Sequence, residues 1–204
     1  MYNTIIFDLG GVLIDWNPNY VFDTIFNGDG ERKQYFFQHV CTSDWNENQD
    51  AGYPLHQATA DKLAEFPEWE TEIKAFYGRW EEMLGGAIQP TVDIFKKLKA
   101  GNNYRFYALT NWSHETFPIA LERFDFLHWF EGIVVSGEEK TRKPFPEFYK
   151  ILFDRFSVDP RKAIFIDDNL RNVEAGNALG LTGIHFQSAE ELETELQQLQ
   201  VITG

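Results

Sequence analysis

The sequence lacks paired cysteines, long apolar runs and repeats. Cys41 is its single cysteine, so no disulfide can form within the chain. No apolar stretch approaches the roughly 18 residues of a membrane span. The amino-terminal Met1–Thr4 also carries none of the positive side-chain charge of a signal peptide. We therefore expect a cytoplasmic globular protein with no membrane partner.

Positive charge is scarce as well. The chain has 18 Lys and Arg residues against 32 Asp and Glu residues, which makes a formal net charge of -14. Such a balance argues against a general affinity for nucleic acid or for anionic membranes. An acidic protein that binds an anionic substrate needs a local positive site, most simply a metal ion with one or two cationic side chains. Aromatic residues are abundant, at 16% of the chain, and predict a ring-rich core.

Short apolar runs predict a buried parallel sheet. Continuous apolar stretches are typical of strands that are covered on both faces. We expect strands at Thr4–Phe7, Tyr104–Leu109, Gly132–Val135, Ala163–Ile166 and Thr182–Phe186. Helical patterns lie between them, at Thr91–Ala100, Pro146–Phe156 and Asn172–Leu179. Strands that alternate with helices predict an α/β fold with a Rossmann-like parallel sheet.

One long segment, from about Asn17 to Gly86, interrupts this alternation. It contains amphipathic helical patterns and no convincing strand. We expect a core made of residues 1–16 and 87–204, with a helical cap subdomain inserted at 17–86 after the first strand. An insertion there would lie over the carboxyl ends of the strands, where ligands bind in open α/β sheets. The alternative is a packing subdomain that does not touch the substrate.

Two of the predicted strands end in carboxylates. The run from Phe7 to Val12 places Asp8 at the end of the first strand, and its paired glycines allow a sharp turn and the close approach of a ligand. The alternative is that Asp8 caps a turn. Asp167 and Asp168 follow another strand, and adjacent carboxylates repel each other unless a positive charge lies nearby. Magnesium is a cation of the right chemistry, whereas a helix N-cap would explain only one of the two.

Two further polar segments can contact an anion. Thr110 and Asn111 end the strand at 104–109, and a hydroxyl with neighbouring backbone N–H groups can hold a phosphate oxygen. Thr110 is equally suited to capping a helix. Lys143 precedes Pro144, which keeps the lysine backbone extended and lets its ammonium group point at an anion. The alternative for Lys143 is an ordinary surface position.

The order of these segments resembles the haloacid dehalogenase-like (HAD) hydrolase superfamily. The resemblance spans essentially the whole chain and rests on Phe7–Leu13, on Lys143-Pro144-x-Pro146 and on Ile166–Gly180. The opening segment is most similar to the branch that contains bacterial glucose-1-phosphate phosphatases and the phosphatase domain of some epoxide hydrolases. The resemblance implies a magnesium-dependent hydrolase of small phosphate monoesters, with the helical insertion choosing the substrate.

The resemblance also assigns roles to individual residues. Asp8 would be the nucleophile and would form an aspartyl-phosphate. Thr110, Asn111 and Lys143 would bind the transferring phosphoryl group, and Lys143 would also offset its repulsion by the carboxylates. The implied magnesium ligands are Asp8, the backbone carbonyl of Gly10 and Asp168. Asp167 would either bind the metal directly or contact one of its ligands.

Position 10 departs from the family pattern. Phosphatases of this family usually carry a second Asp two residues after the nucleophile, where it protonates the leaving oxygen and later activates water. Gly10 has no proton to offer, although some members of the similar branch also have glycine there. Such proton transfer contributes about 10²–10⁴-fold, so substrates with acidic leaving alcohols, such as sugar 1-phosphates, are expected to be favoured. Asp15 is the nearest spare carboxylate.

Several functions remain open at this point. They are a phosphatase adapted to lack that acid, a haloacid dehalogenase, and a catalytically weak binding protein with the same fold. Dehalogenases use no metal and normally have an aromatic residue at position 10, so Asp167, Asp168 and Gly10 favour the phosphatase. Candidate pocket residues, each of which has simple packing as its alternative, are Trp16, Trp45, Asp50 and Trp112. The sequence predicts neither the exact substrate nor the oligomeric state.

Overall fold

The computed structural model describes residues 1–202, in which a parallel sheet carries helices on both faces. The sheet has 5 strands in the order β5-β4-β1-β6-β7, and all neighbouring strands are parallel. Their bounds are β1 Thr4–Phe7, β4 Arg105–Thr110, β5 Gly132–Val135, β6 Ala163–Asp167 and β7 Thr182–His185. The predicted α/β fold is confirmed, and every predicted strand agrees with the observed one to within about one residue at each end.

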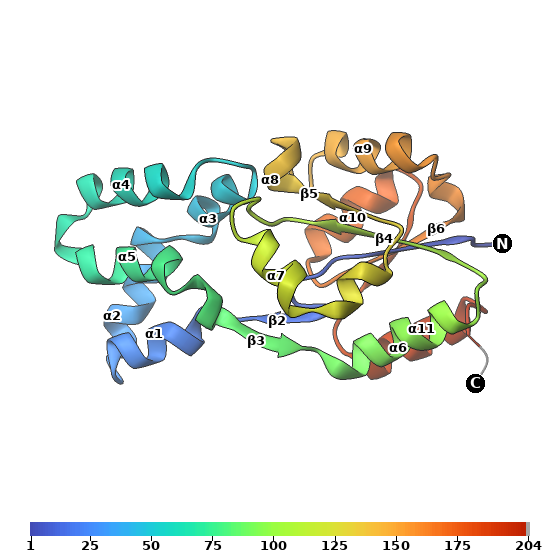
Figure 1. Ribbon diagram of the computed structural model, residues 1–204, viewed down its shortest axis with the longest axis horizontal. Helices are drawn as coiled ribbons and strands as arrows, with labels where there is room; N and C mark the ends of the chain where they lie inside the picture. The colour runs from blue at the N-terminus through green and yellow to red at the C-terminus, as the bar shows by residue number, and fades with distance from the viewer. Residues whose placement is uncertain (203–204) are drawn as a thin grey trace.

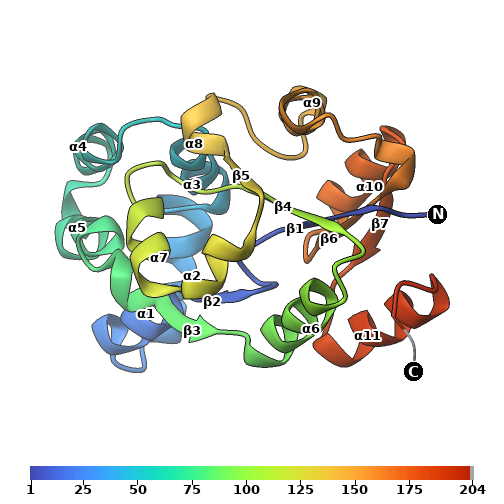
Figure 2. The ribbon, with the colours of Figure 1, turned by 45° about the vertical axis from the view of Figure 1, so that its right-hand side comes forward.

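Different helices cover the two faces of the sheet, because alternate residues of a strand point to opposite sides. Ile5 and Phe7 of β1 pack in the cluster that includes α6 (Gln89–Ala100) and α11 (Ala189–Gln198), whereas Ile6 packs in the cluster of α9 (Pro146–Phe156) and α10 (Leu170–Ala178). Figures 1 and 2 show these two pairs of helices on opposite sides of the sheet. Burial on both faces explains why each strand is continuously apolar.

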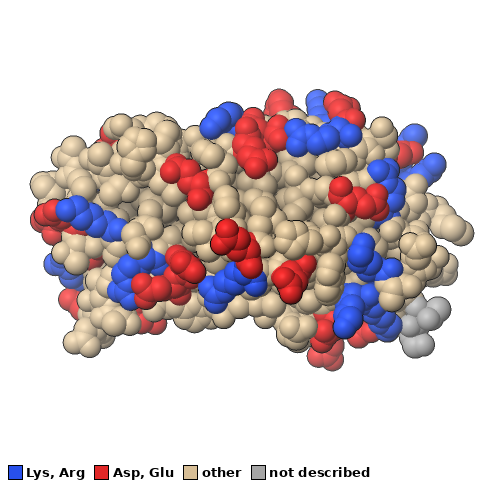
Figure 3. All heavy atoms as spheres, in the orientation of Figure 1, with Lys and Arg blue, Asp and Glu red and all other residues tan. Residues whose placement is uncertain are grey.

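Short elements complete this part of the molecule. They are α7 (Phe117–Arg123), a 3-10 turn at Asp125–Trp129, α8 (Ser136–Glu139) and a 3-10 turn at Pro160–Lys162. Within residues 1–202, none of the helices combines the length and the apolar character that a bilayer span requires. On the face drawn in Figure 3, Lys and Arg side chains lie among Asp and Glu side chains. That face therefore lacks the extended basic patch typical of nucleic-acid-binding proteins.

Residues 19–83, which we call the helical segment, stand beside the carboxyl ends of the strands (Figure 1). Phe22 contacts the rings of Phe26, Phe36 and Phe76 at centroid distances of 6.1, 5.1 and 5.9 Å, so the interior of the segment is ring-rich. Its elements are α1 (Asn19–Phe26), α2 (Gly30–Tyr35), a π-helix at Phe36–Val40, α3 (Ser43–Asp50), α4 (Leu55–Glu65), a 3-10 turn at Pro67–Trp69, α5 (Glu70–Gly78) and a 3-10 turn at Trp80–Met83.

A two-stranded antiparallel ribbon joins the helical segment to the sheet. β2 (Ile14–Trp16) pairs with β3 (Leu84–Ala87). The expectation of no strand between Asn17 and Gly86 is therefore wrong at its carboxyl end. The sequence Leu-Gly-Gly-Ala has little intrinsic preference for a strand, and it becomes one only because the fold brings β2 alongside it.

Candidate active site

The ends of β1 and β6 bring three carboxylates together. One oxygen from each of Asp8, Asp167 and Asp168 lies within 4.8 Å of the other two. The cause is the pairing of the two strands, in which Phe7 lies opposite Ile166. Because the strands are parallel and adjacent, the residues that follow them leave the sheet at the same edge.

Lys143 lies inside this cluster. Its side chain is 0% exposed, and its Nζ lies 2.8 Å from Asp8 Oδ2 and 2.7 Å from Asp167 Oδ2. Burial alone would lower the pKa of Lys143, but the carboxylates of Asp167 and Asp8 raise it above its usual value. The amine therefore stays charged and holds the two carboxylates in place.

Asn111 positions the backbone of Lys143. Its side-chain carbonyl accepts a hydrogen bond from the Lys143 N–H at 2.8 Å, and its amide donates to the Lys143 carbonyl at 3.0 Å. Both ends of the Asn111 side chain are therefore occupied by the Lys143 backbone. The phosphate contact that the sequence predicted for this residue stays a prediction. Thr110 differs, because its hydroxyl is buried and has no partner among residues 1–202. A ligand oxygen would satisfy that hydroxyl.

The neighbouring Asp167 and Asp168 have different surroundings. Asp167 is fully buried: its Oδ2 binds Lys143, and its Oδ1 accepts hydrogen bonds from the Asn169 N–H at 2.8 Å and from Asn172 Nδ2 at 3.1 Å. Asp168 is exposed and lines a cavity. The first carboxylate is thus committed to holding Lys143, and the second is free to meet a ligand.

The paired glycines Gly10 and Gly11 differ in the space that surrounds them. Gly11 has φ of 73°, in the left-handed region, and a Cβ there would lie 2.2 Å from Asp168 Oδ2. At Gly10, by contrast, a Cβ would meet no atom within 4 Å. The fold therefore requires glycine at position 11 and leaves open space at position 10, beside Asp8.

The cluster fits a divalent cation. Three carboxylates lie close together and a single ammonium group, that of Lys143, contacts two of them, so negative charge is in excess. Burial, which is the largest cause, and the charges of Asp167 and Asp168 raise the pKa of Asp8 to about 8, against the opposing effect of Lys143. Burial and Asp167 also raise the pKa of Asp168. The ionised carboxylates therefore lack compensating positive charge, which a hard cation with oxygen ligands would supply.

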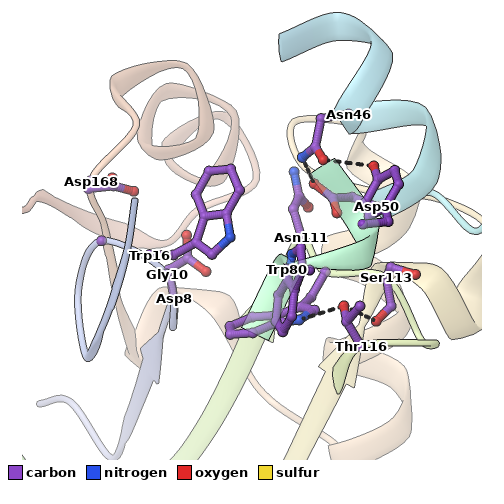
Figure 4. Close-up of a pocket in the computed structure, with 13 residues that line it drawn as sticks. Asp8, Gly10, Trp16, Asn46, Asp50, Trp80, Asn111, Ser113, Thr116 and Asp168 are labelled. Carbon is purple, nitrogen blue, oxygen red and sulfur yellow. Dashed lines mark hydrogen bonds between the residues drawn. The ribbon is translucent and has the colours of Figure 1, made fainter. Parts of the chain in front are cut away.

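A cavity of about 220 Å³ opens beside the carboxylates (Figure 4). Asp8, Gly10 and Asp168 form one side of it, and Figure 4 shows Asn46 and Asp50 across the cavity from them. The wall opposite the carboxylates is thus built partly from the helical segment. The remaining lining residues are Gly11, Trp16, Tyr77, Trp80, Asn111, Trp112, Ser113 and Thr116.

Of the candidate pocket residues, Trp16, Asp50 and Trp112 line this cavity, and Trp45 does not. Trp45 instead packs on Phe76 and Tyr77, at centroid distances of 5.1 and 5.4 Å. Five further lining residues were not predicted, because nothing in their local pattern distinguishes them from packing residues: Asn46, Tyr77, Trp80, Ser113 and Thr116.

Asp15, the spare carboxylate nearest to Gly10 in the sequence, lies outside the cavity. Its Oδ2 accepts a hydrogen bond from the Tyr20 hydroxyl, and the same oxygen would lie 2.3 Å from a Cβ at Gly85. The side chain therefore packs against the β2–β3 ribbon, away from Asp8.

Ionic contacts tie the helical segment to the edge of the sheet. Glu47 of α3 lies 2.7 Å from Arg142 Nη2 and 2.7 Å from Arg171 Nη2. Glu115, after β4, accepts a hydrogen bond from the Leu55 N–H at 2.8 Å. Together these contacts hold α3 and the start of α4 beside the cavity.

Comparison with known proteins identifies the family. A family model described as haloacid dehalogenase-like hydrolase matches residues 2–180. The chain belongs to this family. The predictions of a HAD-like protein and of a hydrolase are thus confirmed.

Two curated proteins match this HAD hydrolase over nearly its whole length. The sesquiterpene phosphatase astK of Aspergillus oryzae is 26% identical over 201 residues, which cover 97% of this chain and 96% of astK. The drimenol cyclase drtB of Aspergillus calidoustus is 29% identical over 202 residues, which cover 98% of this chain and 37% of drtB. The chain thus matches about a third of the length of the second relative.

Solved structures confirm the fold. The magnesium complex of the HAD family enzyme bt-2542 from Bacteroides thetaiotaomicron has a TM-score of 0.73 at 20% identity, with 96% of this chain and 98% of that chain covered. The complex of bt-2542 with magnesium and inorganic phosphate has a TM-score of 0.69 at 23% identity, with 92% and 96% covered. The HAD hydrolase described here shares their architecture over nearly its full length.

Proposed function

We propose that this HAD hydrolase is a magnesium-dependent phosphatase of small phosphate monoesters, with a covalent intermediate on Asp8. The observation that carries the proposal is the position of Lys143 Nζ, 2.8 Å from Asp8 and 2.7 Å from Asp167 in a buried cluster. A carboxylate nucleophile, a fixed ammonium group and a cation site at one edge of the sheet can bind a phosphoryl group and attack it. The relative astK, which is named a phosphatase, supports this choice of chemistry.

The proposed roles follow from the contacts of each side chain. Asp8 Oδ1 accepts a hydrogen bond from the Leu9 N–H at 2.7 Å, which orients the carboxylate for attack on phosphorus. Lys143 and the unpartnered Thr110 hydroxyl would hold phosphoryl oxygens. Magnesium, held by Asp8, Asp168 and the Gly10 carbonyl, would supply further positive charge to those oxygens. Asp167 would position Lys143.

We also propose that the helical segment is the substrate-selecting cap, within the predicted division into a core of residues 1–16 and 87–204 and a cap of residues 17–86. The support is that the segment contributes Asn46, Asp50, Tyr77 and Trp80 to the wall opposite the carboxylates. Because the phosphoryl group would lie at the sheet, the rest of the substrate would face this wall. The cytoplasmic location stays a prediction.

A sugar phosphate is the substrate that the cavity favours. Its wall combines the rings of Trp16, Trp80 and Trp112 with polar groups such as Asn46 and Ser113. Aromatic faces pack on sugar rings, and polar side chains bind hydroxyl groups. The Trp16 Nε1 donor is buried and has no partner among residues 1–202, so a substrate hydroxyl would satisfy it. A sesquiterpenyl phosphate is the competing candidate, because the same rings also suit an apolar group.

A phosphate-release screen tests this proposal. Purified protein would be assayed with glucose 1-phosphate, glucose 6-phosphate, a nucleoside monophosphate and farnesyl phosphate, each with magnesium and with a chelator. We expect magnesium-dependent release, fastest from a sugar phosphate. Chloride release from 2-chloropropionate in the presence of chelator would show a dehalogenase instead. Binding without turnover of any compound would show a binding protein.

A further inference from the structure

The cavity needs a proton donor on the side that faces the leaving group. In phosphoryl transfer, the attacking and leaving oxygens lie roughly in line on opposite sides of phosphorus. If Asp8 attacks, the leaving oxygen points to the opposite wall. Lys143 lies beside the nucleophile, where it contacts Asp8 and Asp167, and Gly10 has no side chain. The proton must therefore come from the opposite wall or from solvent.

Asp50 is the carboxyl group on that wall. It ends α3, lines the same cavity as Asp8 and lies across from it in Figure 4. Other groups on the wall are weaker acids, since the pKa of Tyr77 is raised by burial and Ser113 and Thr116 carry alcohols. Among the cavity-lining residues that the structure describes, the other carboxylates are Asp8 and Asp168, and both lie at the sheet.

We propose that Asp50 protonates the leaving oxygen and then deprotonates the water that releases phosphate from Asp8. This proposal rests on the phosphatase function above. In the first step, an Asp8 oxygen bonds to phosphorus, the bond from phosphorus to the leaving oxygen breaks, and the proton of Asp50 passes to that oxygen. In the second, water attacks phosphorus from the vacated side, Asp50 takes its proton, and the bond to Asp8 breaks. Asp50 ends protonated, so no other reactant is needed.

Hydrogen bonds hold the Asp50 carboxyl group in position. Asn46 Nδ2 donates to Asp50 Oδ2 at 3.1 Å, and the Asn46 carbonyl accepts from the Tyr77 hydroxyl at 2.9 Å. The backbone carbonyl of Asp50 accepts a hydrogen bond from the hydroxyl of Ser136, the first residue of α8, which directly follows β5. The carboxyl group is thus oriented within the helical segment, and its backbone is attached to the sheet. This attachment ties the end of α3 that carries Asp50 to the part of the fold that carries Asp8.

The charges around Asp50 suit both steps. Burial and Glu47 raise its pKa, while Arg142, a hydrogen bond from the Ser113 backbone and Lys143 lower it, and the result is a pKa of about 7. Tyr77, the other titratable group on this wall, stays neutral because its own pKa is raised. Near neutral pH both the protonated and the ionised carboxyl are populated, as a group that acts first as an acid and then as a base requires.

The decisive experiment compares two substrates with different leaving groups. The alcohol of glucose 6-phosphate needs a proton to leave, whereas nitrophenolate from p-nitrophenyl phosphate does not. We expect Asp50→Asn to lower kcat/KM about a hundredfold or more on glucose 6-phosphate and less than about threefold on p-nitrophenyl phosphate. Asp44→Asn, an exposed change on the same helix, should leave both values unchanged. Equal losses on both substrates, or no loss on either, would overturn the proposal.

The pH profile provides a second readout. In the wild type, kcat/KM on glucose 6-phosphate should fall as pH rises through about 7, because Asp50 then loses the proton that it must donate. The fall should be absent in Asp50→Asn. An unchanged profile in that variant would assign the titration to another group and would overturn the proposal.

A second variant, Gly10→Asp, distinguishes the loss of a proton donor in Asp50→Asn from a loss of folding. Position 10 has room for a side chain beside Asp8. In the Asp50→Asn background, Gly10→Asp should restore hydrolysis of glucose 6-phosphate. In the wild type, Gly10→Asp should change the ratio of the kcat/KM values for the two substrates by less than about threefold, because an acid is already present. A hundredfold gain on glucose 6-phosphate in the wild-type background would contradict a role for Asp50.

Failure of the phosphatase function proposed above would give a different result. Turnover of p-nitrophenyl phosphate would then persist in the presence of chelator and in the Asp8→Asn variant.

Discussion

The two walls of the cavity are built in different ways. At the sheet, Asp8, Lys143 and Asp167 are at most 8% exposed and are joined by contacts of 2.7 and 2.8 Å. At the helical segment, Asn46 and Asp50 are only partly buried, and α3 is held by the ionic contacts of Glu47. Strand ends in a packed sheet place reacting groups rigidly, whereas helices on a two-stranded ribbon are free to adjust. We therefore expect substitutions at the sheet to slow the hydrolysis of every substrate, and substitutions in the helical segment to slow the hydrolysis of only some substrates.

The largest expected effect is that of Asp8→Asn at the sheet. Asparagine has nearly the same shape but is a poor nucleophile, so hydrolysis of every substrate should fall by more than about a thousandfold. Phosphate release measures the loss, and thermal unfolding checks that the fold is intact. In a crystal soaked with beryllofluoride, which mimics a phosphoryl group, density should be bonded to Asp8 alone. A variant that keeps about a tenth of the wild-type rate would contradict the covalent mechanism.

The second prediction separates the two neighbouring carboxylates at the carboxyl end of β6, Asp167 and Asp168. Asp168→Ala should raise the magnesium concentration for half-maximal activity about a hundredfold, and Asp167→Ala only about tenfold, because Asp167 acts mainly through Lys143. Asp167→Ala should also lower the free energy of unfolding by about 1–3 kcal/mol, since it leaves buried donors without an acceptor. Magnesium titrations and chemical denaturation in chelator measure these effects. The same metal requirement in both variants would mean that both side chains bind the ion directly.

The third prediction concerns the paired glycines. Gly11→Ala should lower the free energy of unfolding by at least about 1–2 kcal/mol, because its positive φ is unfavourable for any residue with a Cβ. It should also displace Asp168, which the new methyl group would overlap. Gly10→Ala is the matched control for stability, since its Cβ enters open space. Similar unfolding midpoints for the two variants would show that the turn adapts to a side chain at position 11.

The smallest effect is expected where the helical segment meets the sheet. Glu47→Gln removes the charge that binds both Arg142 and Arg171, at a cost of about 0.2–1 kcal/mol for each partly exposed pair. We expect a rise in KM of a few fold and faster hydrogen exchange in α3 and in the β2–β3 ribbon, on which the cap would open. Glu72→Gln, which breaks a pair with Arg32 inside the helical segment, is the control. Equal exchange in the two variants would argue against a cap that opens on the ribbon.

The strands of the sheet and the carboxylates at their ends could be predicted from the sequence alone. These features are local: a strand buried on both faces must be apolar, and polar side chains right after it must reach the edge of the sheet. Lys143 was assigned to this site only through the family resemblance, because its local pattern equally fits an exposed lysine. Because residues that follow parallel strands meet at one edge of the sheet, the motifs at Asp8 and at Asp167-Asp168 predicted a single site, although they lie far apart in the sequence.

The contacts of the individual side chains at this site could not be predicted, because they depend on how the whole chain folds. The tertiary structure directs Asn111 and Asp167 to Lys143, leaves Asp168 facing the cavity, pairs β2 with β3 and places Asp50 opposite Asp8. Each of these outcomes depends on a contact between segments that are distant in the sequence. A local pattern shows which residue types are present, but the direction in which a side chain points, and the partner that it meets, are set by the packing of the whole fold.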